Sequence, residues 1–319
     1  MKLTVLDGHA ANPGDLSWDK FKKIADLTVY ERTPADMVIQ RIGDSDAIFL
    51  NKIQITKQIL DSCPKLKYIG VLATGYNVVD LAECTKKNIT VTNIPAYSTD
   101  SVAQHVFAFI LNYSNQVASH AASVKNGDWT RSPDFCYWNS SLTELTGKTL
   151  GIFGFGSIGQ KVAKIAHAFG MRVIICTHNP DSFTGGEEVV SKEELFKQSD
   201  FLSLHAPLTD STKNLVNRQT LSLVKKGAVI INTARGGLVD ENTVKEALIQ
   251  KKIAMYCADV VLTEPMDKNC PLLDAPNCVI TPHIAWAPKE TRQRLFDIAF
   301  DNLNSFIAGK PVNVVNKGL

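Results

Sequence analysis

Short apolar runs alternate with amphipathic stretches along almost the whole chain, which predicts an α/β protein with parallel sheets. The first set of predicted strands covers residues 3–6, 27–30, 47–50, 68–72 and 90–92. The second set covers residues 149–153, 172–176, 201–204, 228–232, 253–258 and 278–281. Two sets of strands separated by helical sequence predict two doubly wound parallel-sheet domains.

Helical patterns connect the two sets of strands. One pattern runs from Thr99 to about Lys125, long enough to pass from one domain to the next. Another runs from Pro288 to Ala308 with no strand after it, so we expect this last helix to return to the first domain. Ser191 and Glu194 have the spacing of a capping box before the strand at 201–204.

The segment from Gly127 to Thr146 is aromatic but has no clear periodicity. It can be a loop that packs on its own subunit, or an arm that pairs with a second copy. So many aromatic side chains in irregular sequence need a surface that buries them. This favours a homodimer formed through the segment and the helix before it.

Composition limits the class of protein. The 319 residues suffice for two domains, and 45% hydrophobic with 21% charged residues is ordinary for a globular protein. A net charge of +2 is too small to indicate nucleic acid or an anionic membrane as partner. The seven cysteines contain no C-x-x-C pair, so we expect free thiols and no metal site. No apolar run spans a bilayer or forms a signal sequence, which favours a cytoplasmic location.

The most specific motif is Gly154-Phe155-Gly156-Ser157-Ile158-Gly159, directly after the predicted strand 149–153. In that position the first glycine allows a tight turn, the second lets the backbone approach a pyrophosphate, and the third lets helix pack on strand. The following helix N-terminus attracts phosphate. A strand-to-helix turn that binds nothing is the alternative; the context favours a dinucleotide site.

Polar residues follow the other strands of the second set, at the edge where open α/β sheets bind ligands. In chain order they are Thr177-His178-Asn179, His205-Ala206-Pro207, Thr233-Ala234-Arg235, Asp259 with Glu264, and Pro282-His283. Arg235 can bind a carboxylate bidentately, His283 can donate a proton near neutral pH, and Glu264 can orient its ring. These groups suit hydride transfer to a 2-keto acid. Alone, Arg235 could form a surface ion pair and His283 could be a capping or core histidine.

Together these motifs resemble the D-isomer-specific 2-hydroxyacid dehydrogenase family over essentially the full length. The resemblance lies in the glycine motif, in residues 232–240 and 281–287, and in Asp259 with Glu264-Pro265. The order Arg235, Glu264, His283, with separations of 29 and 19 residues, matches that family. The resemblance implies that Arg235 binds the substrate carboxylate and carbonyl, that His283 is the acid/base with Glu264 as partner, and that Asp259 holds the nicotinamide amide.

The family fold inserts a Rossmann cofactor domain into a flavodoxin-like substrate domain. It implies a substrate domain of residues 1–102 with 288–319 and a dinucleotide domain of residues 103–287. Ala73, Thr74 and Gly75 resemble the substrate loop, whose N–H groups receive the carboxylate together with Arg235 and His283. The implied coenzyme contacts are Val102, Gly154, Gly156, Ser157, Ile158, Gly159, Thr177, His178, His205, Ala206, Pro207, Thr212, Thr233, Ala234, Asp259 and Ala285.

Within the family, residues 7–8, 12–18 and 284–286 look most like glycerate dehydrogenases, which reduce hydroxypyruvate. We therefore expect reduction of hydroxypyruvate or glyoxylate to D-glycerate or glycolate. D-lactate dehydrogenase-like reduction of pyruvate, and a non-catalytic dinucleotide sensor like the corepressors, are the alternatives. Trp138 and Trp286 are candidates for shaping the substrate pocket.

The choice between NAD and NADP depends on the residues that follow the strand at 172–176. NAD-dependent members usually have an acid after the second strand, where this chain has Thr177 and His178. Asp181 is a candidate for a displaced acid. We expect NAD(H) as coenzyme, with NADP(H) tolerated.

Overall fold

The computed structural model describes residues 1–180 and 183–317, so Asp181 lies outside the described residues. The chain forms two units. The discontinuous unit consists of Met1–Ser98 with Trp286–Leu319, and the central unit of Thr99–Ala285. The domain junctions predicted after residues 102 and 287 lie within a few residues of these.

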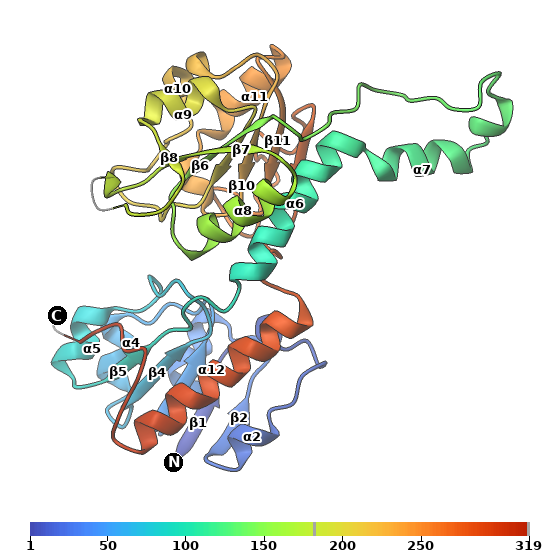
Figure 1. Cartoon of the computed structure of the whole chain (residues 1–319). Helices are drawn as coiled ribbons and strands as arrows, with labels where there is room; N and C mark the ends of the chain where they lie inside the picture. Colours follow the sequence, from blue (N-terminus) through green and yellow to red (C-terminus); the bar gives the residue numbers. More distant parts are fainter. Residues whose placement is uncertain (181–182, 318–319) are drawn as a thin grey trace. The chain divides into compact units, whose positions relative to one another are not determined.

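In the described part of the discontinuous unit, parallel strands form one sheet in the order β2-β1-β3-β4-β5 (Figure 1). This is the order of flavodoxin-like sheets. The strands are β1 (Lys2–Val5), β2 (Asp26–Val29), β3 (Ala47–Leu50), β4 (Tyr68–Val71) and β5 (Thr90–Thr92). The helices are α1 (Gly8–Ala11), α2 (Asp19–Lys22), η1 (Ala35–Met37), α3 (Val38–Ile42), α4 (Lys57–Ser62), α5 (Leu81–Lys86) and α12 (Lys289–Ile307).

The C-terminal helix α12 completes the core of the discontinuous unit. Phe296 is 1% exposed, and its ring centroid lies 4.4 Å from that of Trp18 and 5.8 Å from that of Phe21. Arg292 donates from both terminal nitrogens to the carboxylate of Asp15 at 2.6 Å. The last helix therefore packs where the sequence expected it, against elements from the start of the chain.

The described part of the central unit contains a second parallel sheet, in the order β12-β11-β10-β9-β6-β7-β8. Its strands are β6 (Thr149–Phe153), β7 (Arg172–Cys176), β8 (Glu188–Val189), β9 (Phe201–Leu204), β10 (Ala228–Asn232), β11 (Ile253–Ala258) and β12 (Cys278–Ile280). The order reverses between β6 and β9, and this switch point is the usual place for a bound dinucleotide. The predicted fold class, two doubly wound parallel sheets, is confirmed. The short edge strand β8 was not predicted.

The helices of the central unit are α6 (Thr99–Asn115), α7 (Val117–Lys125), η2 (Trp129–Arg131), α8 (Ser157–Ala168), α9 (Lys192–Gln198), α10 (Arg218–Leu223), η4 (Gly236–Leu238) and α11 (Glu241–Ile249). The prediction of one helix from Thr99 to about Lys125 is wrong. Gln116 takes a left-handed conformation (φ 47°, ψ 41°), which ends α6 and starts α7 in a new direction. Neither glycine nor proline marks this break in the sequence.

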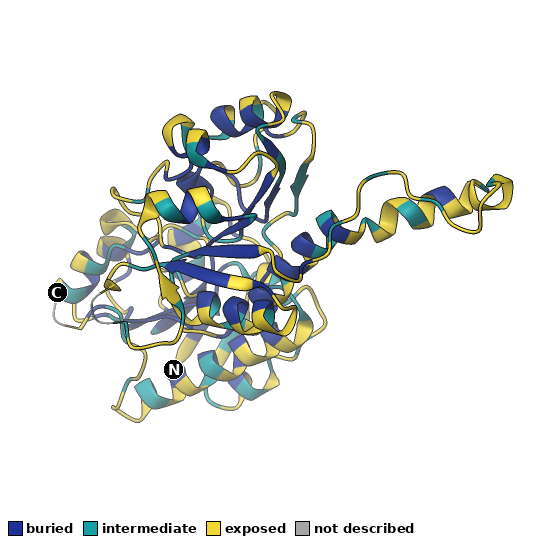
Figure 2. Cartoon of the chain, turned by 45° about the horizontal axis from the view of Figure 1, so that its top comes forward, coloured by how far each residue is buried: buried dark blue, intermediate teal, exposed yellow. Residues whose placement is uncertain are grey.

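Within the central unit, α7 and the segment after it extend away from the sheet (Figure 1). Most of this projection is exposed (Figure 2). Its large apolar side chains include Val117, 70% exposed, Phe135, 90% exposed, and Trp138, 65% exposed. Phe135 and Trp138 are therefore not buried by the described part of their own chain, whereas Tyr137 is half-buried and donates to Ser123 at 3.0 Å.

The helix start predicted at Ser191 is present, but only half of the capping box is. Ser191 accepts a hydrogen bond from the N–H of Glu194 at 3.2 Å. The Glu194 carboxylate accepts hydrogen bonds from Lys197 and Gln198, each at 3.0 Å. The reciprocal box forms instead at Asn217 and Thr220, at the start of α10.

His205 lies directly after β9, beside the switch point of the central sheet. Its N–H donates to the carbonyl of Phe153 at 2.8 Å, and its Nε2 lies 2.8 Å from Ser203 Oγ. Burial lowers the pKa of His205 from 6.5 to about 4. The ring is therefore neutral in the folded protein at neutral pH.

This burial predicts a loss of stability in acid. Between pH 6.5 and about 4, the unfolded chain binds a proton at His205 and the folded chain does not, so the free energy of unfolding falls as pH falls. A shift of this size corresponds to up to about 3 kcal/mol. Urea unfolding at a series of pH values should show a shallower acid dependence for His205→Gln than for the unmodified protein. Parallel curves for the two proteins would contradict the assignment.

Candidate active site

Three loops of the central unit meet at one edge of its sheet. The strands β10, β11 and β12 are adjacent and parallel, so their carboxyl ends lie at the same edge. Arg235 follows β10, Glu264 follows β11, and His283 follows β12. The topology therefore brings the three predicted catalytic residues to one edge.

Glu264 and His283 form a direct pair. His283 Nδ1 lies 2.6 Å from Glu264 Oε2, and the two side chains are 28% and 34% exposed. The other carboxylate oxygen of Glu264, Oε1, accepts from the N–H of Val261 at 3.2 Å. With Nδ1–H donating to a carboxylate, Nε2 is the ring nitrogen left for a reacting group.

The loop that carries His283 is held by one buried carboxylate. Asp259 is 1% exposed. Its oxygens accept from the N–H groups of Ile284 and Ala285, both at 2.8 Å, and from the hydroxyl of Thr281 at 2.6 Å. The backbone of His283 between them is left-handed (φ 55°), a conformation that costs a non-glycine residue about 1 kcal/mol or more. Asp259 therefore fixes both flanks of a strained residue.

The sequence assigned Asp259 to the nicotinamide amide. A carboxylate has about four acceptor positions, and the loop residues use three of them in this structure. Its bracing of the His283 loop was not predicted, because two of its three partners are backbone N–H groups that no sequence motif marks.

Arg235 lies on a loop shaped by Asn232, which is fully buried at the end of β10. Asn232 Nδ2 donates to the carbonyl of Arg235 at 2.9 Å, and its Oδ1 accepts from the N–H of Ala234 at 3.0 Å. The Arg235 guanidinium is exposed and donates to the carbonyl of Ala234 at 2.7 Å. The sequence did not assign this role to Asn232, although a polar residue ending an apolar strand was a visible signal.

Backbone contact ties the Arg235 loop to the Glu264 loop. A Cβ on Gly236 would lie 2.0 Å from the carbonyl carbon of Val261, so only glycine allows this approach. Val261 in turn donates to Glu264. Neighbouring backbone therefore links the positions of the guanidinium and the carboxylate.

The glycine motif has the geometry that a phosphate group requires. Gly154 has a φ of 91°, and a Cβ there would lie 2.8 Å from the carbonyl carbon of His205. A Cβ on Gly159 would lie 2.5 Å from the carbonyl oxygen of Gly154, whereas one on Gly156 would meet nothing within 4 Å. The first and third glycines thus permit tight packing, and the second leaves open space.

The N-terminus of α8 has donors to offer in that space. Gly156 is the N-cap and supplies no side-chain cap. Within residues 1–180 and 183–317, the N–H groups of Ser157, Ile158 and Gly159 have no hydrogen-bond partner. The buried hydroxyl of Thr233, after β10, also lacks a partner among the described residues. Unpaired donors around an open backbone cradle fit a dinucleotide phosphate.

Four of the remaining predicted coenzyme contacts lie in the segment that follows β9. His205, Ala206 and Pro207 follow β9, the neighbour of β6 at the switch point. The hydroxyl of Thr212 donates to the carbonyl of Pro207 at 2.7 Å and accepts from the N–H of Thr209 at 2.8 Å, so it shapes that loop.

The predicted contacts at the other positions differ in exposure. Val102 on α6 and Ala285 after β12 are 6% and 4% exposed. Thr177 is half-buried directly after β7, and His178 is exposed beside it. The carboxyl end of β7 therefore presents a hydroxyl and an imidazole.

In the discontinuous unit, Ala73, Thr74 and Gly75 follow β4 at its carboxyl end. The Thr74 hydroxyl donates to the carbonyl of Ile94 at 2.9 Å, and Ile94 N–H donates to Ala73 at 3.0 Å. The N–H groups of residues 73–75 have no partner among the described residues. The loop therefore holds three backbone donors available to an anion.

The tryptophans proposed for the pocket lie in different surroundings. Trp286 packs on the core of the discontinuous unit, with its ring centroid 6.5 Å from that of Tyr97. Trp138 lies on the exposed segment after α7.

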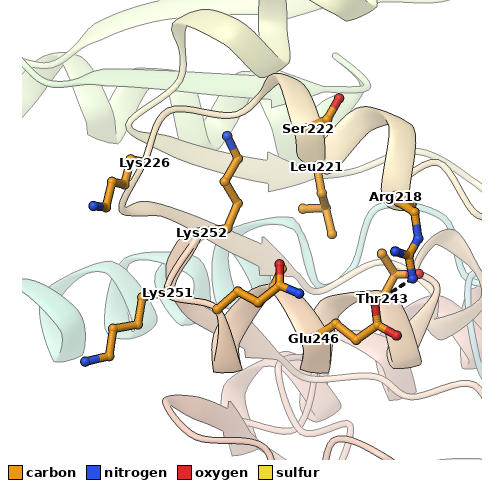
Figure 3. A pocket seen from close by; sticks show the side chains of 10 residues that line it. Arg218, Leu221, Ser222, Lys226, Thr243, Glu246, Lys251 and Lys252 are labelled. Carbon is orange, nitrogen blue, oxygen red and sulfur yellow. Dashed lines mark hydrogen bonds and ion pairs between the residues drawn. The ribbon is translucent and has the colours of Figure 1, made fainter.

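A hollow of about 530 Å³ lies between α10 and α11 in the central unit (Figure 3). Arg218 and Glu246 form an ion pair of 2.6 Å on its wall. Lys226 precedes β10, and Lys251 and Lys252 precede β11, so the hollow lies toward the amino ends of these strands. It is not part of the edge that carries Arg235, Glu264 and His283.

The described residues contain neither a metal-binding cluster nor a helix that could span a membrane. Among residues 1–180 and 183–317, no three His, Cys, Asp or Glu side chains cluster as a metal would require. No helix in the same ranges has both the length and the apolar character needed to cross a bilayer.

Comparison with known proteins gives a consistent result. The model of the D-isomer specific 2-hydroxyacid dehydrogenase NAD binding domain matches residues 107–285. The hydroxypyruvate reductase of Blautia hydrogenotrophica is 46% identical over 99% of this chain and 100% of its own length. The glycerate dehydrogenase of Methylorubrum extorquens is 40% identical over 90% of each chain.

Among solved structures, an acyclic imino acid reductase in complex with NADPH and D-Arg superimposes with a TM-score of 0.87. It is 33% identical, over 99% of this chain and 100% of that one. The matched NAD-binding domain contains the glycine motif and all three residues of the sheet edge. The chain belongs to the D-isomer-specific 2-hydroxyacid dehydrogenases, NAD(P)-dependent oxidoreductases that act on a CH–OH group.

Proposed function

We propose that this enzyme reduces hydroxypyruvate and glyoxylate to D-glycerate and glycolate, with NADH as coenzyme and NADPH tolerated. The observation that carries the proposal is the 2.6 Å bond between His283 Nδ1 and Glu264 Oε2 at the carboxyl edge of the central sheet. The hydroxypyruvate reductase and glycerate dehydrogenase relatives, at 46% and 40% identity, support the choice of substrate.

In the proposed mechanism Arg235 binds the substrate carboxylate and carbonyl through its planar fork of donors. His283 donates the proton from Nε2 to the carbonyl oxygen, and Glu264 holds the ring with that nitrogen facing the substrate. The reduced nicotinamide, when bound, supplies the hydride for the carbonyl carbon. In the reverse direction His283 takes the proton from the hydroxyl.

The substrate carboxylate also takes backbone donors from Ala73, Thr74 and Gly75 in this proposal. Their N–H groups have no partner in the described residues, and bonds from Ile94 and Asn93 fix the loop. Several neutral donors and one cation suit a small 2-keto acid anion better than an uncharged ketone.

For the coenzyme, we assign the pyrophosphate to Gly156, Ser157, Ile158 and Gly159 at the start of α8. Thr177 and His178, which follow β7 with no carboxylate directly after the strand, would hold the ribose of the adenosine half. A 2′-phosphate therefore meets no repulsion from these two residues, which supports tolerance of NADP(H). The proposed coenzyme contacts also include His205, Ala206, Pro207, Thr212, Val102, Thr233, Ala234, Asp259 and Ala285.

Steady-state rates with hydroxypyruvate, glyoxylate and pyruvate, each with NADH and NADPH, test the substrate and coenzyme. We expect kcat/KM for hydroxypyruvate to exceed that for pyruvate by at least about tenfold, because a site that binds the extra hydroxyl loses that bond with pyruvate. Pyruvate as the best substrate would favour a lactate dehydrogenase-like enzyme. Coenzyme binding without turnover of any acid would favour a dinucleotide sensor.

The same assay with His283→Gln and Arg235→Gln tests the assigned roles. His283→Gln should lower kcat by about 10²–10⁴-fold and leave NADH binding intact, since the proton donor is lost. Arg235→Gln should raise KM and lower kcat together, because its charge holds the anion in the reactive pose. Arg218→Gln, which removes an exposed arginine of the hollow between α10 and α11, is the matched control. Wild-type turnover in either site variant would remove that residue from the mechanism.

We also propose that the enzyme is a homodimer that pairs through the segment from Gly127 to Thr146 and helix α7. The support is apolar surface: Phe135 is 90%, Trp138 65% and Trp129 52% exposed. Exposed aromatic side chains gathered on one projecting segment are unfavourable in water unless a partner covers them. A cytoplasmic location is proposed with it, because all seven cysteines are free thiols, as in reducing compartments.

Light scattering after size-exclusion chromatography tests the dimer. The unmodified protein should elute with twice the 35.0 kDa chain mass, and the double variant Phe135→Ser, Trp138→Ser should shift toward the monomer. Leu273→Ser, which replaces a 64% exposed apolar residue elsewhere, should leave the mass unchanged. A monomeric unmodified protein, or a double variant that remains a dimer, would refute the proposed interface.

A further inference from the structure

His105 lies inside α6 and points toward the loop that carries His283. Its side chain is 18% exposed, and its ring packs edge-on against Phe109 with centroids 4.6 Å apart. Its Nε2 lies 2.9 Å from the hydroxyl oxygen of Thr281. Neither the sequence motifs nor the assigned site residues include His105.

The direction of this hydrogen bond follows from counting protons. The Thr281 hydroxyl has one hydrogen, and it donates that hydrogen to Asp259 Oδ1 at 2.6 Å. The Thr281 oxygen can then only accept from His105, so His105 carries its proton on Nε2. Burial lowers the pKa of His105, which favours a neutral ring with an unprotonated Nδ1.

The bond from His105 to Thr281 adds a side chain of α6 to the hydrogen-bond network around His283. Asp259 accepts a hydrogen bond from Thr281, which precedes His283 in the chain. It also accepts hydrogen bonds from Ile284 and Ala285, which follow His283. The N–H of His283 itself donates to the carbonyl of Thr281 at 2.9 Å. Thr281 is therefore the residue through which a side chain of α6 reaches the backbone of His283.

The helix that supplies this donor is firmly placed in the central unit. Val106 and Ile110, which follow His105 on α6, are 0% exposed in a core shared with β6 and α8. Asp100 on the same helix pairs with Lys161 of α8 at 2.7 Å. Because this helix is well packed, a donor on it holds the Thr281 hydroxyl in one position.

We propose that His105 is a positioning residue for His283. By donating from Nε2 to Thr281, it orients the hydroxyl toward Asp259 and keeps the loop at 281–285 in the conformation where His283 Nδ1 meets Glu264. The proposal rests on the assignment of His283 as the proton donor in the proposed function. It assigns no contact between His105 and substrate.

Three variants separate this role from simple packing. His105→Phe keeps a ring but removes the donor, and His105→Gln keeps an N–H donor the same number of bonds from Cα. Thr281→Val keeps the shape of threonine but removes the hydroxyl. We expect kcat for hydroxypyruvate to fall about 10–100-fold in His105→Phe and Thr281→Val, with NADH affinity unchanged, because small displacements of a reacting group are costly.

The conservative variant and the double variant give the decisive comparisons. His105→Gln should recover most of the lost kcat. His105→Phe with Thr281→Val should be no slower than Thr281→Val alone, because that variant already removes the bond to His105 together with the bond to Asp259. Unchanged kcat in His105→Phe, failure of His105→Gln to recover, or additive losses would each overturn the proposal. If His105→Phe does not fold, His105→Leu, which also removes the donor, must show the same loss of kcat.

A readout that needs no turnover distinguishes this proposal from the proposed function. In ¹⁵N-histidine-labelled protein, the Nδ1–H proton of His283 should resonate far downfield because of its short bond to Glu264. The signal should move in His105→Phe and Thr281→Val and return in His105→Gln. An unmoved signal refutes the positioning role, whether or not any keto acid is reduced.

Discussion

A buried carboxylate that receives three hydrogen bonds from one loop is the interaction on which the candidate site depends. Asp259 is 1% exposed and binds the hydroxyl of Thr281 and the N–H groups of Ile284 and Ala285. A buried charge is costly unless its acceptor positions are satisfied, so the loop and the carboxylate stabilise each other. The left-handed backbone of His283 can persist because both of its flanks are fixed.

The topology of the central sheet explains why this loop lies near the other chemistry. Because β10, β11 and β12 are parallel neighbours, the residues that follow them gather at one edge without any long connection. The switch point between β6 and β9 sets the glycine cradle at the carboxyl end of the same sheet. The phosphate cradle and the proton donor thus depend on one backbone arrangement.

The sequence predicted the elements that arise from local apolar runs. The six predicted strands of the central unit begin where predicted, because each is a short apolar run bounded by polar residues. Among these six, β12 alone ends one residue earlier than predicted. The edge strand β8 was missed because its two residues, Glu188 and Val189, form no apolar run and pair only with β7. The break at Gln116 was missed because a left-handed glutamine has no signature in a helical pattern.

The residues of the candidate site also differ in whether the sequence could reveal them. Arg235, Glu264 and His283 could be found from their positions after successive strands, because parallel topology makes strand ends meet. The role of Asn232 was marked only by a polar residue at the end of an apolar strand. The contact of His105 could not be found, because its partner is a hydroxyl far away in the sequence. Asp259 was recognised as important, but its hydrogen bonds to the loop follow only from the fold.

A crystal structure of the Asp259→Ala variant tests the central claim most directly. We predict that its fold is unchanged, that His283 leaves the left-handed region, and that the 2.6 Å contact of Nδ1 with Glu264 is lost. A variant structure in which His283 keeps both its backbone conformation and this contact would contradict the account.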